Sequence, residues 1–139
     1  MRCACGIALE GQPGQAYNEE AFRHLLSVER RHAARTQRSC LLLLVSLRAA
    51  SGTADLLRPE AASAIFGGLS VVVREVDFVG GFREERIAGA FLAQGTEFSA
   101  AAPLAIGERV TDAIGLRLTA ADVDRLHVRV LRLRPRRPA

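Results

Sequence analysis

Two groups of charged residues near the middle of the chain have types and spacing that could support chemistry. Arg74 and Asp77 form an R-x-x-D pair, and residues 83–86 read Arg-Glu-Glu-Arg. A guanidinium is a planar fork of donors that matches phosphate, and a carboxylate accepts hydrogen bonds. The pair also has a structural interpretation, in which Arg74 complements the C-terminus of a helix and pairs with Asp77 across a turn. The charged tetrad is interpreted either as a docking point for another protein or as a solvated turn.

The residues around these groups predict the elements that must position them. Short apolar runs at 78–82 and 87–92 flank the tetrad and predict a β-hairpin with a polar tip. A helix is expected before the hairpin, because Pro59 suits a first helical position and apolar residues then recur at helical spacing to about residue 75. The glycine pair at 67–68 lowers the propensity of this helix.

The remaining segments predict a single α/β domain. Asn18 is a suitable N-cap for a helix at 19–36, and the almost wholly apolar segment 40–47 predicts a buried strand in the middle of a sheet. A helix is expected at about 100–113, followed by a half-exposed strand at 126–134. The order is therefore α-β-α-β-β-α-β. Its last six elements match a ferredoxin-like sandwich, an α+β fold with a mainly antiparallel central sheet and helices packed on it.

Residues 74–87 resemble the signature region of the diguanylate cyclase, or GGDEF, family. In that family an R-x-x-D motif ends a helix, five residues form a strand, and the G-G-D/E-E-F signature forms a hairpin tip. The resemblance implies the nucleotide-cyclase fold and an enzyme that joins two GTP molecules into cyclic di-GMP. Weaker matches at 20–22, 41–44 and 107–110 extend it over roughly residues 17–135. Arg74 and Asp77 match the R-x-x-D motif, and the signature positions hold Arg83, Glu84, Glu85, Arg86 and Ile87.

The sequence departs from the family at the positions that the reaction needs. The family uses two carboxylates to hold metal ions that bridge the triphosphate and activate the 3′-hydroxyl. The first of these positions is Val45, which leaves Glu85 as a single carboxylate and a poor site for Mg²⁺. Arg83 and Glu84 replace the two signature glycines, which lack side chains and so let the backbone approach the nucleotide. We therefore expect a catalytically inactive GGDEF-like regulatory or interaction domain in bacterial signalling, with no cofactor and no metal site.

Two alternative functions remain open. In active family members the R-x-x-D motif is the inhibitory site for cyclic di-GMP, so the resemblance implies that Arg74 and Asp77 could make this chain a receptor for that nucleotide. The second alternative is a nucleic-acid-binding module that uses the arginines near the C-terminus. One tyrosine, no tryptophan and no aromatic pair on a strand disfavour nucleic acid.

Composition limits the remaining possibilities. The chain has 139 residues, enough for one domain, and we divide it into a flexible leader at 1–16, the GGDEF-like domain at 17–135 and a basic tail at 136–139. All 19 basic residues are arginines, so lysine chemistry is excluded, and the net charge of +4 comes from arginines after Asp124.

Three cysteines suit a reduced, cytoplasmic setting, and no membrane span is expected. The expected partner is another signalling protein or a second copy of the chain. His24, His32 and His127 are too scattered to predict a metal or catalytic site.

Overall fold

The computed structural model describes residues 16–74, 77–93 and 102–133. The helix at 19–36 and the strand at 40–47 have the expected bounds, whereas the helix that begins at Pro59 ends at Val72 instead of about residue 75. One short helix was not predicted. The elements are α1 (Glu19–Thr36), β1 (Cys40–Leu47), α2 (Pro59–Val72), β2 (Phe78–Arg83), β3 (Ile87–Ala93), α3 (Ala102–Gly115), α4 (Ala120–Val123) and β4 (Leu126–Leu133). The unpredicted helix is α4, a single turn that Thr119 caps by accepting a hydrogen bond from the Asp122 N–H. Of the predicted leader and tail, only Ala16 lies among the described residues, and it is fully buried.

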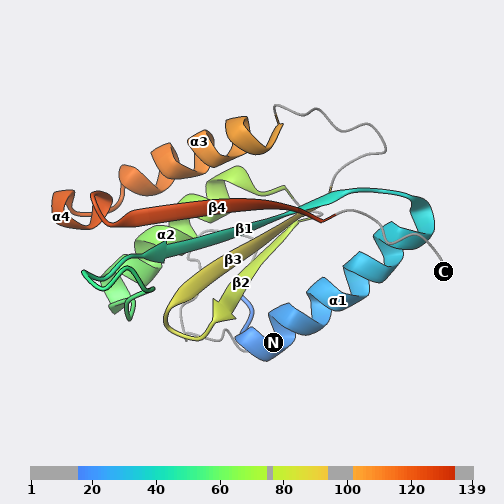
Figure 1. Ribbon diagram of the computed structural model, residues 1–139, viewed down its shortest axis with the longest axis horizontal. Coiled ribbons are helices and arrows are strands. Elements are labelled where there is room, and N and C mark those ends of the chain that lie inside the picture. The colour runs from blue at the N-terminus through green and yellow to red at the C-terminus, as the bar shows by residue number, and fades with distance from the viewer. Residues whose placement is uncertain (1–15, 75–76, 94–101, 134–139) are drawn as a thin grey trace.

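The four strands form one antiparallel sheet in the order β2-β3-β1-β4. This is the strand order of the ferredoxin-like sandwich, and β1 occupies the central position that its apolar sequence predicts. In Figure 1, α3 runs along one side of the strands and α1 lies on the other, with α2 behind the sheet. The predicted fold class is confirmed.

Alternate residues of β1 enter two separate apolar cores. Leu41, Leu43 and Val45 pack with residues of α2 and α3, a cluster that we call the α2/α3 core. Leu42 and Leu44 point to the opposite face and pack with Phe22, which we call the α1 core. Because both faces of β1 are covered, every residue of the strand is buried.

The first helix begins and ends as its sequence indicates. The Asn18 Oδ1 accepts a hydrogen bond from the Ala21 N–H at 2.7 Å, and Gln37 ends the helix in the left-handed conformation, with φ of 56°. Phe22, one turn from the start, is fully buried against the sheet. No helix in the described part of the chain is long and apolar enough to cross a membrane.

Candidate functional site: the signature hairpin and its surroundings

The charged tetrad forms the tip of the β2–β3 hairpin, as the sequence predicts. Residues 83–86 are all exposed, and the Arg86 N–H donates to the Arg83 carbonyl at 3.0 Å to close the turn. Glu85 has a φ of 62°, the left-handed region that non-glycine residues rarely adopt. Ile87, the first residue after the tip, is half-buried and packs on the α1 core.

The tip is attached to the start of α1. The Glu84 N–H donates to the Glu19 carboxylate at 2.6 Å, and the Glu19 N–H donates back to the Glu84 carboxylate at 3.3 Å. The Glu84 carboxylate thus satisfies one of the free N–H groups of the first turn of a helix, where negative charge is favoured. We call this reciprocal pair of hydrogen bonds the tip–α1 clasp.

The tip is also attached to the loop between β1 and α2. The Leu57 N–H donates to the Glu85 carbonyl at 2.7 Å, and the Arg86 guanidinium donates to the Ala54 carbonyl at 3.0 Å. Both contacts use main-chain groups of the loop. The side chain of Arg86 therefore joins the hairpin tip to the β1–α2 loop.

The carboxylates needed for a metal centre are not assembled here. Val45, at the first expected ligand position, is fully buried in the α2/α3 core and lies opposite Ala88 of β3. The Glu85 side chain is exposed at the tip. Among the described residues no group of three His, Cys, Asp or Glu side chains could hold a metal ion. The donor set at this end of β1 does not fit a magnesium pair.

Arg74 and Asp77 contact each other at the base of the hairpin. The Asp77 side chain is fully buried, whereas that of Arg74 is 57% exposed. The Asp77 carboxylate accepts from the Arg74 N–H at 2.9 Å, from the Arg74 guanidinium at 3.1 and 3.2 Å, and from the Ala93 N–H at 3.0 Å. The guanidinium also donates to the Ala93 carbonyl. The pair therefore joins the residues after α2 to the last residue of β3.

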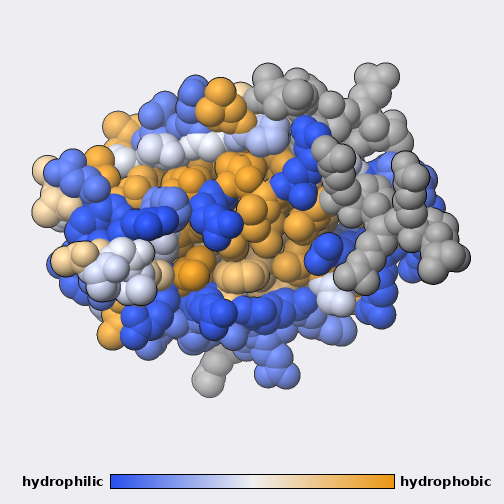
Figure 2. All heavy atoms as spheres, in the orientation of Figure 1, coloured by the Kyte–Doolittle hydropathy of each residue, from blue (hydrophilic) through white to orange (hydrophobic). Residues whose placement is uncertain are grey.

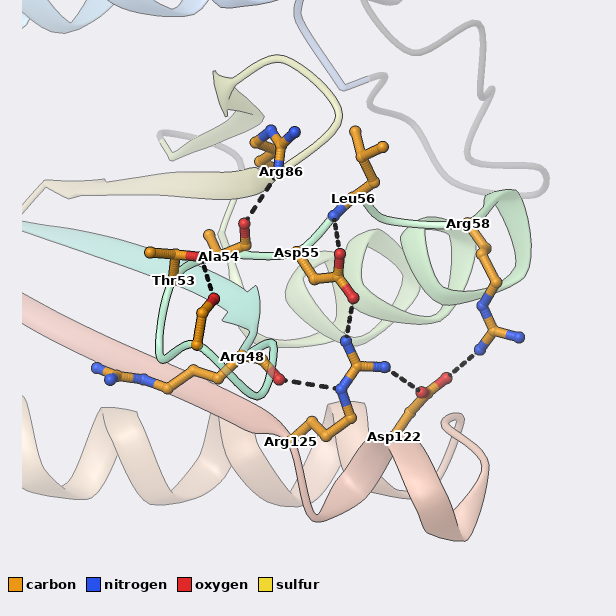
Figure 3. A network of polar contacts seen from close by, with 10 residues as sticks. Arg48, Thr53, Ala54, Asp55, Leu56, Arg58, Arg86, Asp122 and Arg125 are labelled. Carbon is orange, nitrogen blue, oxygen red and sulfur yellow. Dashed lines mark hydrogen bonds and ion pairs between the residues drawn. The ribbon is translucent and has the colours of Figure 1, made fainter.

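A polar network that the sequence did not predict holds the β1–α2 loop from the other side (Figure 3). The Arg125 guanidinium donates to Asp55 at 2.5 Å, to the Arg48 carbonyl at 3.0 Å, and to Asp122 at 3.4 Å. Asp122, nearly buried, also accepts from Arg58 at 2.6 Å. Members of this polar network lie up to 77 positions apart in the sequence, so no local motif could have revealed the network.

The three histidines are not brought together. His24 and His32 are exposed on α1, and His127 lies on β4 with its Nε2 atom 2.8 Å from the Arg48 guanidinium. Burial of the ring and then the positive charges of Arg48 and Arg129 lower the pKa of His127. The arrangement gives a neutral imidazole that receives a hydrogen bond, not a metal ligand set.

Comparison with solved structures identifies the fold. The GGDEF domain of FimX from Pseudomonas aeruginosa superposes with a TM-score of 0.65 at 14% identity, covering 90% of this chain and 80% of that one. A DGC protein from Thermotoga maritima gives 0.63 at 19% identity, covering 85% and 80%. The GGDEF domain of DgcB from Caulobacter crescentus, solved in complex with c-di-GMP, gives 0.61 at 12% identity, covering 95% and 78%. The chain has the fold of a GGDEF domain.

The similarity to GGDEF domains is carried by structure. No protein-family model matches the sequence, and no curated protein matches it. The hairpin tip is held by the tip–α1 clasp and by hydrogen bonds to the main chain of the β1–α2 loop, and Arg74 and Asp77 form the base of the hairpin.

Proposed function

We propose that this chain is a catalytically inactive GGDEF-type domain that acts as a regulatory or interaction module in bacterial signalling, in the cytoplasm. The observation that carries the proposal is that Val45 is fully buried in an apolar core. The GGDEF resemblance implies a metal-binding carboxylate at this position. Glu85 alone cannot bridge a metal pair to a triphosphate.

Two features of the hairpin tip support the same proposal. Arg83 and Glu84 place long charged side chains where the nucleotide would require bare backbone. The Glu84 carboxylate is already used in the tip–α1 clasp. Each feature acts against GTP binding independently of the missing metal ligand.

A cyclase assay tests the loss of activity. Purified protein is incubated with GTP and either Mg²⁺ or Mn²⁺, and cyclic di-GMP is measured by liquid chromatography with mass spectrometry, beside an active diguanylate cyclase. We expect no product. Formation of cyclic di-GMP that disappears in Glu85→Ala would show that the remaining carboxylate is catalytic, and would refute the proposal.

A second candidate function is a receptor for cyclic di-GMP at Arg74 and Asp77. It is favoured by the exposure of the Arg74 guanidinium, which leaves donor atoms available to a phosphate, and by the neighbour solved in complex with c-di-GMP. The Asp77 carboxylate would have to release some of its four internal donors to accept from guanine. Titration calorimetry decides: binding that is lost in Arg74→Ala supports the receptor, and no heat at high nucleotide excess eliminates it.

A further inference from the structure

The hairpin holds the start of α1 by more than the tip–α1 clasp. The Arg23 guanidinium donates to the Phe82 carbonyl at 2.9 Å, lies 4.5 Å from the centroid of the Phe82 ring, and contacts the Glu19 carboxylate at 3.5 Å. Figure 1 shows the hairpin turn beside the first turn of α1, and in Figure 2 hydrophilic side chains surround this region, below the apolar surface of the strands. Because water can replace these polar contacts, the tip can open locally while both cores stay folded.

The same tip holds the β1–α2 loop. The Leu57 N–H donates to the Glu85 carbonyl, and the Arg86 guanidinium donates to the Ala54 carbonyl (Figure 3). Within residues 16–74, 77–93 and 102–133, no hydrogen bond or ion pair joins residues 16–23 directly to residues 48–58. The hairpin tip is therefore the polar link between the start of α1 and the β1–α2 loop.

The conformation of Glu85 connects the two sets of contacts. Its φ of 62° lies in the left-handed region, which costs a non-glycine residue free energy and persists only where the surrounding structure enforces it. The preceding residue, Glu84, is held by α1, and the Glu85 carbonyl and Arg86 are held by the loop. If Glu84 is released, Glu85 can return to an ordinary backbone conformation, and its carbonyl then turns away from the Leu57 N–H.

We propose that the hairpin tip is a conformational link, in which release of the start of α1 lets Glu85 leave the left-handed conformation and thereby frees the β1–α2 loop. The tip has two discrete arrangements, and the contacts at both of its ends favour the same one. Breaking either set of contacts therefore weakens the other. As a route of regulation this coupling rests on the proposed regulatory function, whereas as a property of the fold it is measured without a partner or a nucleotide.

Amide hydrogen exchange, followed by two-dimensional NMR of the full chain, measures the coupling. Glu19→Ala removes one half of the tip–α1 clasp, and we expect the Leu57 amide to exchange at least about fivefold faster in this variant. Glu20→Ala is the matched control, because Glu20 is an exposed acidic residue in the same first turn of α1, and it should change that rate by less than about twofold. The Ala93 amide, at the base of the hairpin, is the internal reference and should keep its rate in both variants.

A glycine in the turn tests the role of Glu85. Glycine adopts the left-handed conformation without steric cost, so the Glu85→Gly protein should keep the turn even when the clasp is absent. We expect Glu19→Ala to accelerate exchange of the Leu57 amide by less than about twofold in this background. The comparison isolates the backbone conformation, because the hydrogen bond to Leu57 uses the main-chain carbonyl of residue 85.

Four results would overturn the inference. An unchanged Leu57 rate in Glu19→Ala would show that the two ends of the tip are independent, and equal acceleration in Glu20→Ala would assign the effect to the charge of the first helical turn. Equal acceleration at Ala93 would indicate a general loss of stability. An undiminished effect of Glu19→Ala in the Glu85→Gly background would exclude the Glu85 conformation as the link. Because none of these measurements involves GTP, product in the cyclase assay would refute the proposed inactivity and leave the coupling intact.

Discussion

Replacement of Asp77 by alanine should destabilise the domain much more than replacement of its partner Arg74. The Asp77 side chain is fully buried and accepts two main-chain donors, the Arg74 N–H at 2.9 Å and the Ala93 N–H at 3.0 Å, in addition to the guanidinium. Alanine would leave both N–H groups without this acceptor, and each unsatisfied buried donor costs about 1–3 kcal/mol. Because the pair lies near the surface, the lower half of that range applies, and the expected loss is about 2–4 kcal/mol.

The Arg74→Ala variant removes only the outer part of the contact. The guanidinium is 57% exposed, so water can replace it, while the Asp77 carboxylate keeps its two main-chain donors. The expected cost is about 1 kcal/mol. The asymmetry between the two variants follows from burial, because both lose the same ion pair.

Urea denaturation followed by far-ultraviolet circular dichroism measures both free energies of unfolding. Asp124→Ala, which removes an exposed carboxylate at the end of α4, is the matched control and should change stability by less than about 0.5 kcal/mol. Equal losses in the two test variants, or an Asp77→Ala protein as stable as the control, would show that Asp77 does not hold the base of the hairpin.

Three further predictions concern single side chains. Burial raises the pKa of the Cys40 thiol to about 11, so iodoacetamide should modify Cys40 at neutral pH only after urea is added; equal labelling of the folded protein would contradict this. Burial and Arg48 lower the pKa of His127, so the unfolded state binds the proton more readily. The contribution of His127 to the free energy of unfolding should therefore be fully present above the unfolded pKa of about 6.5 and be lost as the pH falls below it. If a His127→Gln protein loses stability with the same dependence on pH, His127 is not the cause. Asn18→Ala removes the 2.7 Å cap to Ala21 and should lower the free energy of unfolding by about 1 kcal/mol in the same urea assay, with no change counting against the cap.

Local patterns in the sequence predicted most of the fold. The apolar run of β1 and the capped, amphipathic α1 have the expected bounds, because each element is dictated by neighbouring residues. Gly68 shows where this reasoning stops. In sequence it is a weak helical residue, but a Cβ atom there would lie 2.5 Å from Ile114 of α3, so the glycine is required by packing against a distant helix. The same limit explains why the contact of Asp122 with Arg58 was not predicted. The helix α4 has a local signal, the Thr119 cap on the Asp122 N–H, but it is a single turn and was not recognised in the sequence.

The candidate site was predicted as a set of positions, without its contacts. The sequence placed residues 83–86 at a hairpin tip and paired Arg74 with Asp77, and both arrangements are present. It did not indicate that Glu84 would clasp the start of α1, because Glu19 lies 65 positions away. Whether Arg74 and Asp77 also bind a nucleotide stays a prediction.

The attachment of the hairpin tip has a consequence for how this sequence can change over evolutionary time. The hydrogen bond between the tip and Leu57 joins two main-chain groups, and the Arg86 side chain donates to a main-chain carbonyl. Mutation of the Glu85 side chain therefore leaves the Leu57 hydrogen bond available, and the φ of 62° at Glu85 favours glycine there. The backbone conformation of this turn and the side chains on it can therefore change independently. Drift can replace the side chains while selection for a stable domain preserves the backbone conformation.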